Sequence, residues 1–492
     1  MTFYIYIILA YLLVLLGFNF YRAWKVKSQD DFMVAGRSLS VGVMVFTLIC
    51  TWIGSGTFIA GAEYAYKAGF SSLWMPAGAW FGIIVIYFLA GKIRTFGQYT
   101  IGDIMEVRYG KFARLFAAIA LIISFVAIVS YQFVAGGFIL NVITDGAISE
   151  NMGMIISASF VIIFTALAGM VAVAYTDLPN GIIIVFACIL SLPFIYLKVG
   201  GWEAARATLP PEYFQTFNTS FGSHPMLKAF GYFLSTFFLL MGVQSMYQKF
   251  YSAKTPRDAK LSVVFWVIGT VIVEIVVVAI AVFSLVKLGN MIDPNVEKEG
   301  GKLVLLAARH LVPAPVGVLL LAAAVVVVIS TGMNYLLSPT TNIMRDIYQR
   351  FISPDAKQST MVVWQRIWVL ILGVAAFFFA TRLKSVLQMA YFAYTIYGVA
   401  ITPALIAALA WKRATKAGGL ASIVSGVIVT VGLKILTYIL PEHLVPGGDP
   451  FGIPLIFPAI VVSVGSLIIV SLLTPPPKKE ELEKLFPEVA TS

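Results

Sequence analysis

The chain has 492 residues, of which 60% are hydrophobic and only 12% are charged. A soluble domain carries roughly 25% charged residues, so this composition excludes an ordinary soluble protein and indicates many membrane spans. The net charge of +11 would suit nucleic acid, but the basic residues stand in short clusters between apolar stretches, a pattern that reports membrane topology. We therefore expect membrane lipid, and not nucleic acid, around this chain.

The apolar stretches predict about thirteen transmembrane helices, each near the 20 residues that a bilayer requires. They cover residues 3–23, 39–66, 72–93, 113–144, 152–174, 177–198, 228–250, 260–288, 314–337, 361–381, 386–411, 417–440 and 452–473. The first has no basic leader and no small-residue cleavage site, so we expect a retained helix and not a signal peptide. Residues 1–474 are predicted to form one transmembrane domain, and residues 475–492 a solvated cytoplasmic tail.

The basic residues also predict the orientation. When the spans alternate, most of the 34 Lys and Arg fall on one side, Arg114 and Lys249 among them, and the positive-inside rule assigns that side to the cytoplasm. The protein would cross the cell membrane many times, with its amino terminus outside and its carboxyl terminus inside. In the outer loop 289–313, the stretch from Lys302 to His310 could form a short amphipathic helix.

The stretch from Cys50 to Phe58, CTWIGSGTF, is unlike a plain transmembrane helix. Gly54 and Gly56 each weaken a helix by roughly 1 kcal/mol relative to alanine, and the hydroxyl residues beside them would find no partner in lipid. Backbone unwound at membrane depth is tolerated only where protein buries it or where it lines a wet cavity. The stretch therefore predicts a break that forms a binding site, as in transporters whose broken helices hold a solute and its driving ion.

A second break is predicted around Gly242, in the run FFLLMGVQSMYQ from Phe237 to Gln248. Paired Gly-interrupted spans in corresponding positions of two halves point to an inverted-repeat transporter with its site at the bilayer midplane. Residues 39–198 and 228–411 would be the two five-helix halves. One additional helix would precede them and two would follow.

Two adjacent hydroxyls, those of Ser330 and Thr331, end a strongly apolar helix. Sodium is a hard cation, and such cations prefer oxygen ligands. These two hydroxyls, the carbonyl of Val327, and the carbonyls freed by the first break at Thr51 and Gly54 would supply about five oxygens. The alternative is that both hydroxyls bond back to the helix's own carbonyls and only bend it.

Four segments carry a resemblance to a known family. They are CTWIGSGTF with the following Ala62-Glu63, AGMVAVAYTDLPNG from Ala168 to Gly181, QSMYQKFYSAKTPRDAK from Gln244, and ST…NIMRDIY from Ser330 to Tyr348. With these segments the chain resembles the solute:sodium symporter family over almost its whole length. The most specific parts are the pair Thr176-Asp177 and the stretch from Asp31 to Arg37.

This resemblance implies a LeuT-like fold and sodium-coupled alternating access. It maps the sodium ligands onto the backbone of Thr51, Gly54 and Val327 and the side chains of Ser330 and Thr331. Some relatives bind a second sodium between the aspartate of the Thr-Asp pair and two hydroxyls one turn beyond the Ser-Thr pair. Those two positions are Met333 and Asn334 here, and a thioether binds a hard cation poorly, so we expect one sodium per solute.

Two acidic residues are candidates for coupling or gating. Asp177 either caps a helix start or takes part in coupling. Glu274 stands alone in an apolar span, where a carboxylate is costly and usually faces a partner or a cavity. It could contact the substrate, carry a proton or bond another helix. Glu63 and Lys67, four residues apart, are expected to form an ordinary pair.

Residues that flank the breaks are the candidates for solute contacts, although each could equally serve packing. They are Trp52, Ser55, Gly56, Thr57, Tyr131, Gln132, Met241 and Gln244. Trp52 and Tyr131 could form an aromatic cage around a cation. The TWIG…AE stretch resembles choline, vitamin and carboxylate members of the family, but Val243 replaces a tryptophan of the choline type.

The predicted function is thus a sodium-coupled secondary active symporter that imports a small polar organic solute. A uniporter or a proton-coupled transporter remains the alternative within the same fold. A channel would need a lined pore and no paired breaks. An enzyme is not expected, because the cytoplasmic loops are short and lack nucleophile or nucleotide motifs, and sodium is the only metal indicated.

Overall fold

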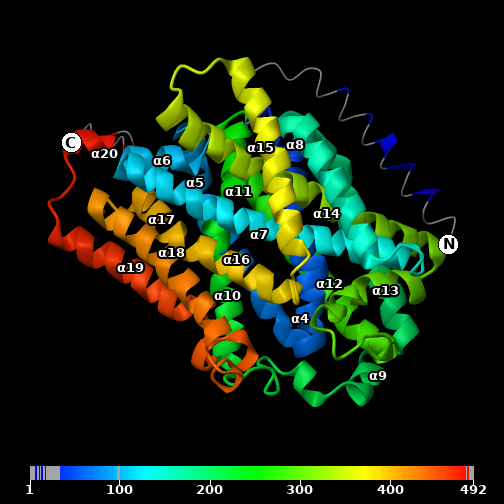
Figure 1. The fold of residues 1–492 in the computed structure, drawn as a ribbon. Coiled ribbons are helices and arrows are strands. Elements are labelled where there is room, and N and C mark those ends of the chain that lie inside the picture. The colour runs from blue at the N-terminus through cyan, green and yellow to red at the C-terminus, as the bar shows by residue number, and fades with distance from the viewer. Residues whose placement is uncertain are drawn as a thin grey trace.

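The computed structural model describes residues 34–96, 100–483 and 485–486, together with scattered positions between residues 6 and 21. The side chains of residues 168–173, 358, 442 and 481 are outside this description, as is most of the predicted span 3–23. The helices gather into one bundle, with α6 and α20 at one end and α9 and α13 at the other (Figure 1). Following the predicted topology, we name these the inner end and the outer end.

Helices form all the long elements of the described chain. The α-helices are α3 (Val41–Trp52), α4 (Gly61–Ala68), α5 (Trp74–Phe96), α6 (Ile101–Tyr109), α7 (Lys111–Ile143), α8 (Glu150–Val199), α9 (Gly201–Thr208), α10 (Pro225–Gly242), α11 (Gln244–Ser252), α12 (Pro256–Leu288), α13 (Leu303–His310), α14 (Ala314–Asn342), α15 (Gln358–Ala380), α16 (Val386–Ala400), α17 (Thr402–Ala410), α18 (Lys416–Ile439), α19 (Ile456–Leu473) and α20 (Lys479–Glu483). Two π-helical stretches extend them, η2 (Gly56–Ala60) and η7 (Ile343–Ile352). Short 3₁₀ turns are η1 (Ala35–Arg37), η3 (Gly69–Leu73), η4 (Pro211–Phe214), η5 (Gly289–Met291), η6 (Glu297–Lys302), η8 (Glu442–Leu444), η9 (Pro446–Gly448) and η10 (Pro450–Gly452).

Among the described residues, 11 helical stretches are long and apolar enough to cross a membrane. They confirm an all-helical protein with many spans, although not the count of thirteen. One stretch, Gly56–Phe96, joins the outer half of the second predicted span to the third. The inner half, α3, has only 12 residues because the chain leaves the helix at the first break.

Helix α8 contains two predicted spans. Its 50 residues would extend about 75 Å if straight, more than twice the roughly 30 Å thickness of a bilayer core. Val161 lies against Gly332 of α14, and Asp177 bonds Ser330 two residues earlier on that helix. A straight helix would separate Val161 from Asp177 by about 24 Å, so the chain returns on itself and its two spans, Glu150–Leu167 and Ala174–Val199, lie antiparallel.

Polar residues at helix starts fix where several spans begin. The hydroxyls of Thr255, Ser385 and Thr415 each accept a hydrogen bond from the backbone three residues on, satisfying an amide that would otherwise lack a partner. Thr100 starts α6 with a full capping box. The predicted helix near Lys302 exists as α13, and the η6 turn before it packs on η2 and α4, covering the outer side of the first break.

Close helix packing uses small residues, as is common in membranes. At Gly78 of α5, a Cβ atom would overlap the backbone of Phe233 in α10, so the two helices touch backbone to backbone. Helices α18 and α19 pack side by side (Figure 1) and share the hydrogen bond between Ser422 and Ser463, 2.9 Å long. These contacts set the bundle around the two broken helices.

Candidate functional site

The first break lies where the sequence predicted it. Helix α3 ends at Trp52, and Ile53 adopts an extended conformation with φ −71° and ψ 93°. The carbonyl of Gly54 then accepts hydrogen bonds from the amides of Thr57 and Phe58, both 3.0 Å long, which starts the outer half-helix. Glycine is needed at position 54, since a Cβ there would come within 2.7 Å of the Thr331 methyl group.

The hydroxyl of Thr331 faces the carbonyl oxygens that the first break leaves free. It donates to the carbonyl of Cys50 at 2.9 Å and to that of Ile53 at 3.3 Å. The sequence pointed to the carbonyls of Thr51 and Gly54, one residue further along. The offset has a local cause: the Gly54 carbonyl already serves the turn of the outer half-helix, so it is not free for an ion.

The Ser330 hydroxyl donates to the carboxylate of Asp177. Neither Ser330 nor Thr331 therefore bends α14 by bonding its own helix, which was the alternative interpretation of this pair. Val327, whose carbonyl was predicted as a ligand, lies fully buried one turn before Thr331. The break in α3 and the hydroxyl pair of α14 thus meet, as predicted, and the oxygens of Cys50, Ile53, Ser330 and Thr331 gather there.

Asp177 lies near the start of the second span of α8, Ala174–Val199, and its side chain contacts other helices. Its carboxylate accepts hydrogen bonds from the hydroxyl of Thr47 at 2.5 Å and from the amide of Asn334 at 3.4 Å. The ammonium of Lys249, in α11, donates to the other end of the Asn334 amide at 2.5 Å. The carboxylate of Asp177 therefore connects α8 to α3 and α14. The buried Lys249 lies on the far side of Asn334.

Two basic residues that the topology prediction counted are buried within the bundle. The sequence interpretation counted Lys249 among the charges of the cytoplasmic loops, but its side chain is fully buried, 0% exposed. Arg114, counted in the same way, is 5% exposed. Both charges belong to the interior of the bundle, because the chain places acidic and amide groups around them.

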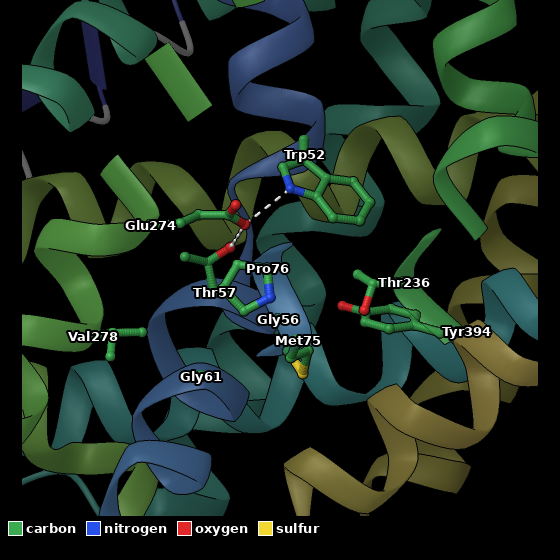
Figure 2. Close-up of a pocket in the computed structure, with 10 residues that line it drawn as sticks. All are labelled: Trp52, Gly56, Thr57, Gly61, Met75, Pro76, Thr236, Glu274, Val278 and Tyr394. Carbon is green, nitrogen blue, oxygen red and sulfur yellow. Dashed lines mark hydrogen bonds between the residues drawn. The ribbon is translucent and has the colours of Figure 1, made fainter. Parts of the chain in front are cut away.

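A small cavity that contains one carboxylate lies beside the first break, on its outer side (Figure 2). Its volume of about 20 Å³ leaves room for about one water molecule. It is lined by Trp52, Gly56, Thr57, Gly61, Met75, Pro76, Thr236, Glu274, Val278 and Tyr394. Three of the predicted solute contacts, Trp52, Gly56 and Thr57, are therefore part of one cavity.

Glu274 of α12 faces this cavity from the side opposite Thr236 and Tyr394 (Figure 2). Its carboxylate accepts hydrogen bonds from the indole N–H of Trp52 at 2.9 Å and of Trp80 at 2.6 Å, and from the Thr57 hydroxyl at 3.3 Å. The side chain is 3% exposed. The structure thus brings Glu274 to the first break, a neighbourhood that its sequence position did not reveal.

The other predicted contacts from α3 and α7 surround the break without lining the cavity. The hydroxyl and the amide of Ser55 both donate to the side-chain carbonyl of Gln132. In the part of the chain that the structure describes, the amide nitrogen of Gln132 is buried without a hydrogen-bond partner. Tyr131 lies behind Tyr394, with 3.2 Å between the two hydroxyl oxygens.

The second break, at Val243, has a different environment. The hydroxyl of Tyr397 bridges it, donating to the Gly242 carbonyl at 2.8 Å and accepting from the Gln244 amide at 2.9 Å. The Gln244 side chain bonds Asn342 and the backbone of Ile101. Gln244 is therefore directed to the inner end and does not reach the cavity.

Met241 also lies away from the cavity. Its side chain lines a groove between α10, α17 and α19 together with apolar residues such as Pro403 and Leu467. The prediction of Met241 and Gln244 as solute contacts is thus not supported by their positions. The cause is rotational: the sequence locates a break, but not the face of the helix that meets the cavity.

A network of charged residues closes the inner end below the second break. The guanidinium of Arg114 pairs with Asp103 at 2.8 Å, Glu106 at 2.7 Å and Asp346 at 2.6 Å. Asn342 donates to Asp346 at 2.5 Å, which links this network to Gln244. Burial raises the pKa of Glu106, in α6 outside the candidate spans, but hydrogen bonds from Arg350 and Arg114 outweigh burial and hold that pKa below its ordinary value.

Glu63 and Lys67 form the expected pair, 2.9 Å apart. Glu63 has a second role that the sequence did not indicate, because it accepts hydrogen bonds from the Ser385 hydroxyl and from the amides of Val386 and Leu387. This carboxylate therefore holds the start of α16 against α4. The contact fixes the outer end, where the positive end of a helix favours an acid.

Sequence reasoning missed several residues of the site. Trp80 and Thr236 stand in ordinary apolar spans, and Tyr394 is one of several tyrosines in its helix, so nothing local singled them out. Lys249 did carry a signal, since a basic residue follows the second break within the same apolar stretch. Thr47 was overlooked because it lies one turn before the first break, inside regular helix.

A bundle with two interrupted helices, an oxygen-lined first break and a small cavity with a carboxylate beside it is typical of a secondary transporter of the LeuT type. The profile of the sodium:solute symporter family matches residues 32–426. The chain belongs to that family. It is a multi-pass membrane protein that couples solute transport to sodium.

Two relatives agree with this assignment. The chain is 26% identical to the human high affinity choline transporter 1 over 90% of this chain and 79% of that protein. It is 24% identical to sodium/proline symporter 2 of Staphylococcus saprophyticus over 96% of this chain and 93% of that protein.

Solved structures share the fold. A Na+-coupled sialic acid symporter, in its substrate-bound outward-open state, is similar with a TM-score of 0.77 and 17% identity over 96% of this chain and 98% of that chain. A nucleobase-cation-symport-1 family transporter in a closed conformation follows, with a TM-score of 0.60 and 12% identity over 92% of this chain and 97% of that one. These identities support the fold alone.

Proposed function

We propose that this transporter imports a small polar organic solute together with one sodium ion, and that the ion binds at the first break. The observation that carries the proposal is the Thr331 hydroxyl, which lies within hydrogen-bond distance of the free carbonyls of Cys50 and Ile53. Oxygen atoms are the ligands that hard cations prefer. An ion entering here would bind the lone pairs of these oxygens, and the Thr331 O–H would turn away from the two carbonyls.

The proposed ligands are the carbonyls of Cys50 and Ile53, the hydroxyls of Ser330 and Thr331, and the carbonyl of Val327. The first two replace the Thr51 and Gly54 carbonyls of the sequence prediction. Ser330 would turn from Asp177 toward the ion, and Asp177 would then supply a negative charge one side chain away. All five groups come from α3 and α14, so the ion would hold these two helices together.

A single sodium is supported by the surroundings of Asp177. The position next to it is occupied by the Asn334 amide and, behind that, by the Lys249 ammonium. A buried ammonium already balances the carboxylate and would repel a second cation. Met333 adds no oxygen there.

The solute is proposed to bind in the cavity at Trp52, Thr57 and Glu274. The present volume of about 20 Å³ is smaller than any organic solute requires, so the cavity has to open. Alternating access would do this by separating the η6 cover at the outer end or the network of Arg114 at the inner end. We assign the amino terminus to the outside and the carboxyl terminus to the cytoplasm of the cell membrane, and we propose no enzymatic activity.

The sodium site is tested with the double variant Ser330→Ala/Thr331→Ala in proteoliposomes. We expect the sodium concentration for half-maximal uptake to rise by at least about tenfold, a loss of about 1.4 kcal/mol. The control is Ser338→Ala, which removes a buried hydroxyl of the same helix that bonds Gln248. Wild-type sodium dependence in the double variant would show that the ion binds elsewhere.

The same assay separates the alternatives. Uptake driven by a proton gradient without sodium would support proton coupling, and uptake that only equilibrates the solute would support a uniporter. The flux ratio of labelled sodium to labelled solute should be one. A ratio of two would mean that Asp177 and Asn334 build a second sodium site despite Lys249.

A further inference from the structure

Four acidic side chains are buried in the outer and central parts of the bundle, and three of them have an evident counterpart. Glu63 pairs with Lys67 and receives the start of α16. Asp449 pairs with Lys228 at the outer end. Asp177 has Lys249 behind Asn334. Glu274 is the fourth, and among the described residues no Lys, Arg or His lies within ion-pair distance of it.

The groups around Glu274 donate hydrogen bonds but carry no charge. The indole N–H groups of Trp52 and Trp80 and the hydroxyl of Thr57 hold its two oxygens at 2.6 to 3.3 Å. Such donors favour the ionised carboxylate and fix its direction. An ionised carboxylate at this position would have no opposite charge of the protein beside it, and an isolated charge in a membrane is costly, so it calls for a cationic partner.

The rest of the cavity suits a cation. The rings of Trp52 and Tyr394 lie with centroids 6.5 Å apart, and their planes are inclined by 33°. Both rings lie across the cavity from the Glu274 carboxylate (Figure 2). The face of an aromatic ring attracts a cation, and tryptophan does so most strongly. Trp52 thus presents its N–H to the carboxylate and its ring to the cavity, so charge and ring face act on the same space.

We infer that the transported solute carries a positively charged nitrogen, which binds between the Glu274 carboxylate and the rings of Trp52 and Tyr394. This inference rests on the proposed function, because it assigns the solute class to the same cavity. The carboxylate supplies a negative charge that has no positive partner among the described residues. The two rings shield the bound nitrogen from water. The unpartnered amide nitrogen of Gln132, near the same break, is a donor for an oxygen elsewhere on the solute.

The test compares a charged solute with a neutral solute of the same shape. Choline has a positively charged quaternary nitrogen where its isostere 3,3-dimethylbutan-1-ol has a neutral quaternary carbon, and the two molecules are otherwise alike. The full-length protein in nanodiscs with sodium is assayed for thermal stabilisation by this pair, by L-proline and glycine betaine as zwitterions, and by pyruvate as an anion. We expect stabilisation by at least one of the ammonium solutes and none by the neutral isostere or the anion.

Variants at position 274 then test the residue. Glu274→Gln should weaken binding of the ammonium solute by at least 100-fold, while Glu274→Asp, which keeps the charge, should retain part of the affinity. The sodium-induced stabilisation should change less than threefold in both. Glu203→Gln, which removes an exposed acid of α9 at the outer end, serves as the control and should bind the solute as the wild type does.

Stabilisation by neutral or anionic solutes alone, or by no ammonium solute, would overturn the inference, as would unchanged affinity in Glu274→Gln. Should that variant fail to fold, the comparison of the ammonium solutes with the neutral isostere and the anion on the wild-type protein still decides the matter. These failures are distinct from failure of the proposed function. If only the inference fails, the protein would still take up a solute of another class in a sodium-dependent manner, and Ser330→Ala/Thr331→Ala would still abolish that uptake.

Discussion

The two helix breaks look alike in the sequence, but the structure gives them different surroundings. The first, at Ile53 to Ser55, opens toward oxygen atoms of α14 and a cavity with a carboxylate. The second, at Val243, is closed by one tyrosine hydroxyl and is joined through Gln244 and Asn342 to the ion pairs of the inner end. One break leaves polar groups available for ligands, and the other uses its polar groups to hold the protein together.

This difference indicates a division of labour within the proposed repeat. Unwound backbone is tolerated at membrane depth when protein or a wet cavity satisfies it. At the first break, a solute and an ion could provide partners for the unwound backbone. At the second break, the hydroxyl of Tyr397 already provides them. Changes at the first break should therefore alter binding, and changes at the second should alter stability or gating.

The largest effect is expected from Gly56→Leu, at the start of the outer half-helix. A Cβ at this position would overlap the hydroxyl of Tyr394, so the larger side chain would fill the cavity. We expect solute uptake to fall by roughly 100-fold or more, as geometric misplacement at a site can do, with normal membrane insertion. Gly42→Leu in α3 is the control, because nothing lies within 4 Å of a Cβ there; equal uptake in both variants would move the solute site elsewhere.

A matched pair of alanine variants compares the two breaks directly. Gly54→Ala would push against Thr331, 2.7 Å from the new Cβ, and Gly242→Ala would overlap the hydroxyl of Thr402. Overpacking costs about 1–3 kcal/mol. At position 54 we expect a roughly tenfold or larger loss of sodium affinity; at position 242 we expect a lower unfolding temperature with sodium affinity retained. Sodium titrations followed by thermal unfolding measure both, and the reverse outcome would refute the division between the breaks.

A smaller effect is expected from Tyr397→Phe. This variant removes the hydroxyl that bridges the Gly242 carbonyl and the Gln244 amide, and a buried group left unsatisfied costs about 1–3 kcal/mol. The protein should unfold at a lower temperature, while its solute and sodium affinities stay near those of the wild type. A selective loss of solute affinity would show that the second break also takes part in binding.

The smallest effect concerns the inner network at Glu106. Its pKa is lowered in the folded protein, so its ion pairs stabilise the fold above the unfolded value of about 4.3 and are lost as the pH falls through the lower folded value. Since the site is partly exposed, Glu106→Gln should cost only about 0–1 kcal/mol at pH 7. The difference from the wild type in thermal unfolding should shrink below about pH 4, and a difference that grows on acidification would contradict this assignment.

Much of the site can be located from the amino-acid sequence. Both breaks, the hydroxyl pair Ser330-Thr331 and the intramembrane acid Glu274 stand out locally, because glycine, adjacent hydroxyls and a lone carboxylate are each unfavourable in a plain apolar helix. The resemblance of four segments to one family then supplies the fold and the ion. Trp80, which bonds Glu274, and the cavity residues Thr236 and Tyr394 could not be located in this way, since aromatic and small polar residues are common in spans that only pack.

What the sequence determined by itself is the pattern along each helix: the spans, the places where helix is weakened and the residue types that lipid cannot satisfy. What the tertiary structure decided is which faces meet. It placed the carbonyls of Cys50 and Ile53 at the Thr331 hydroxyl, turned Gln244 toward the inner end, and buried Lys249 behind Asn334. The physical reason is that a hydropathy pattern records the cost of exposing a residue to lipid, whereas the direction of a carbonyl or a side chain depends on the rotation of one helix against its neighbours.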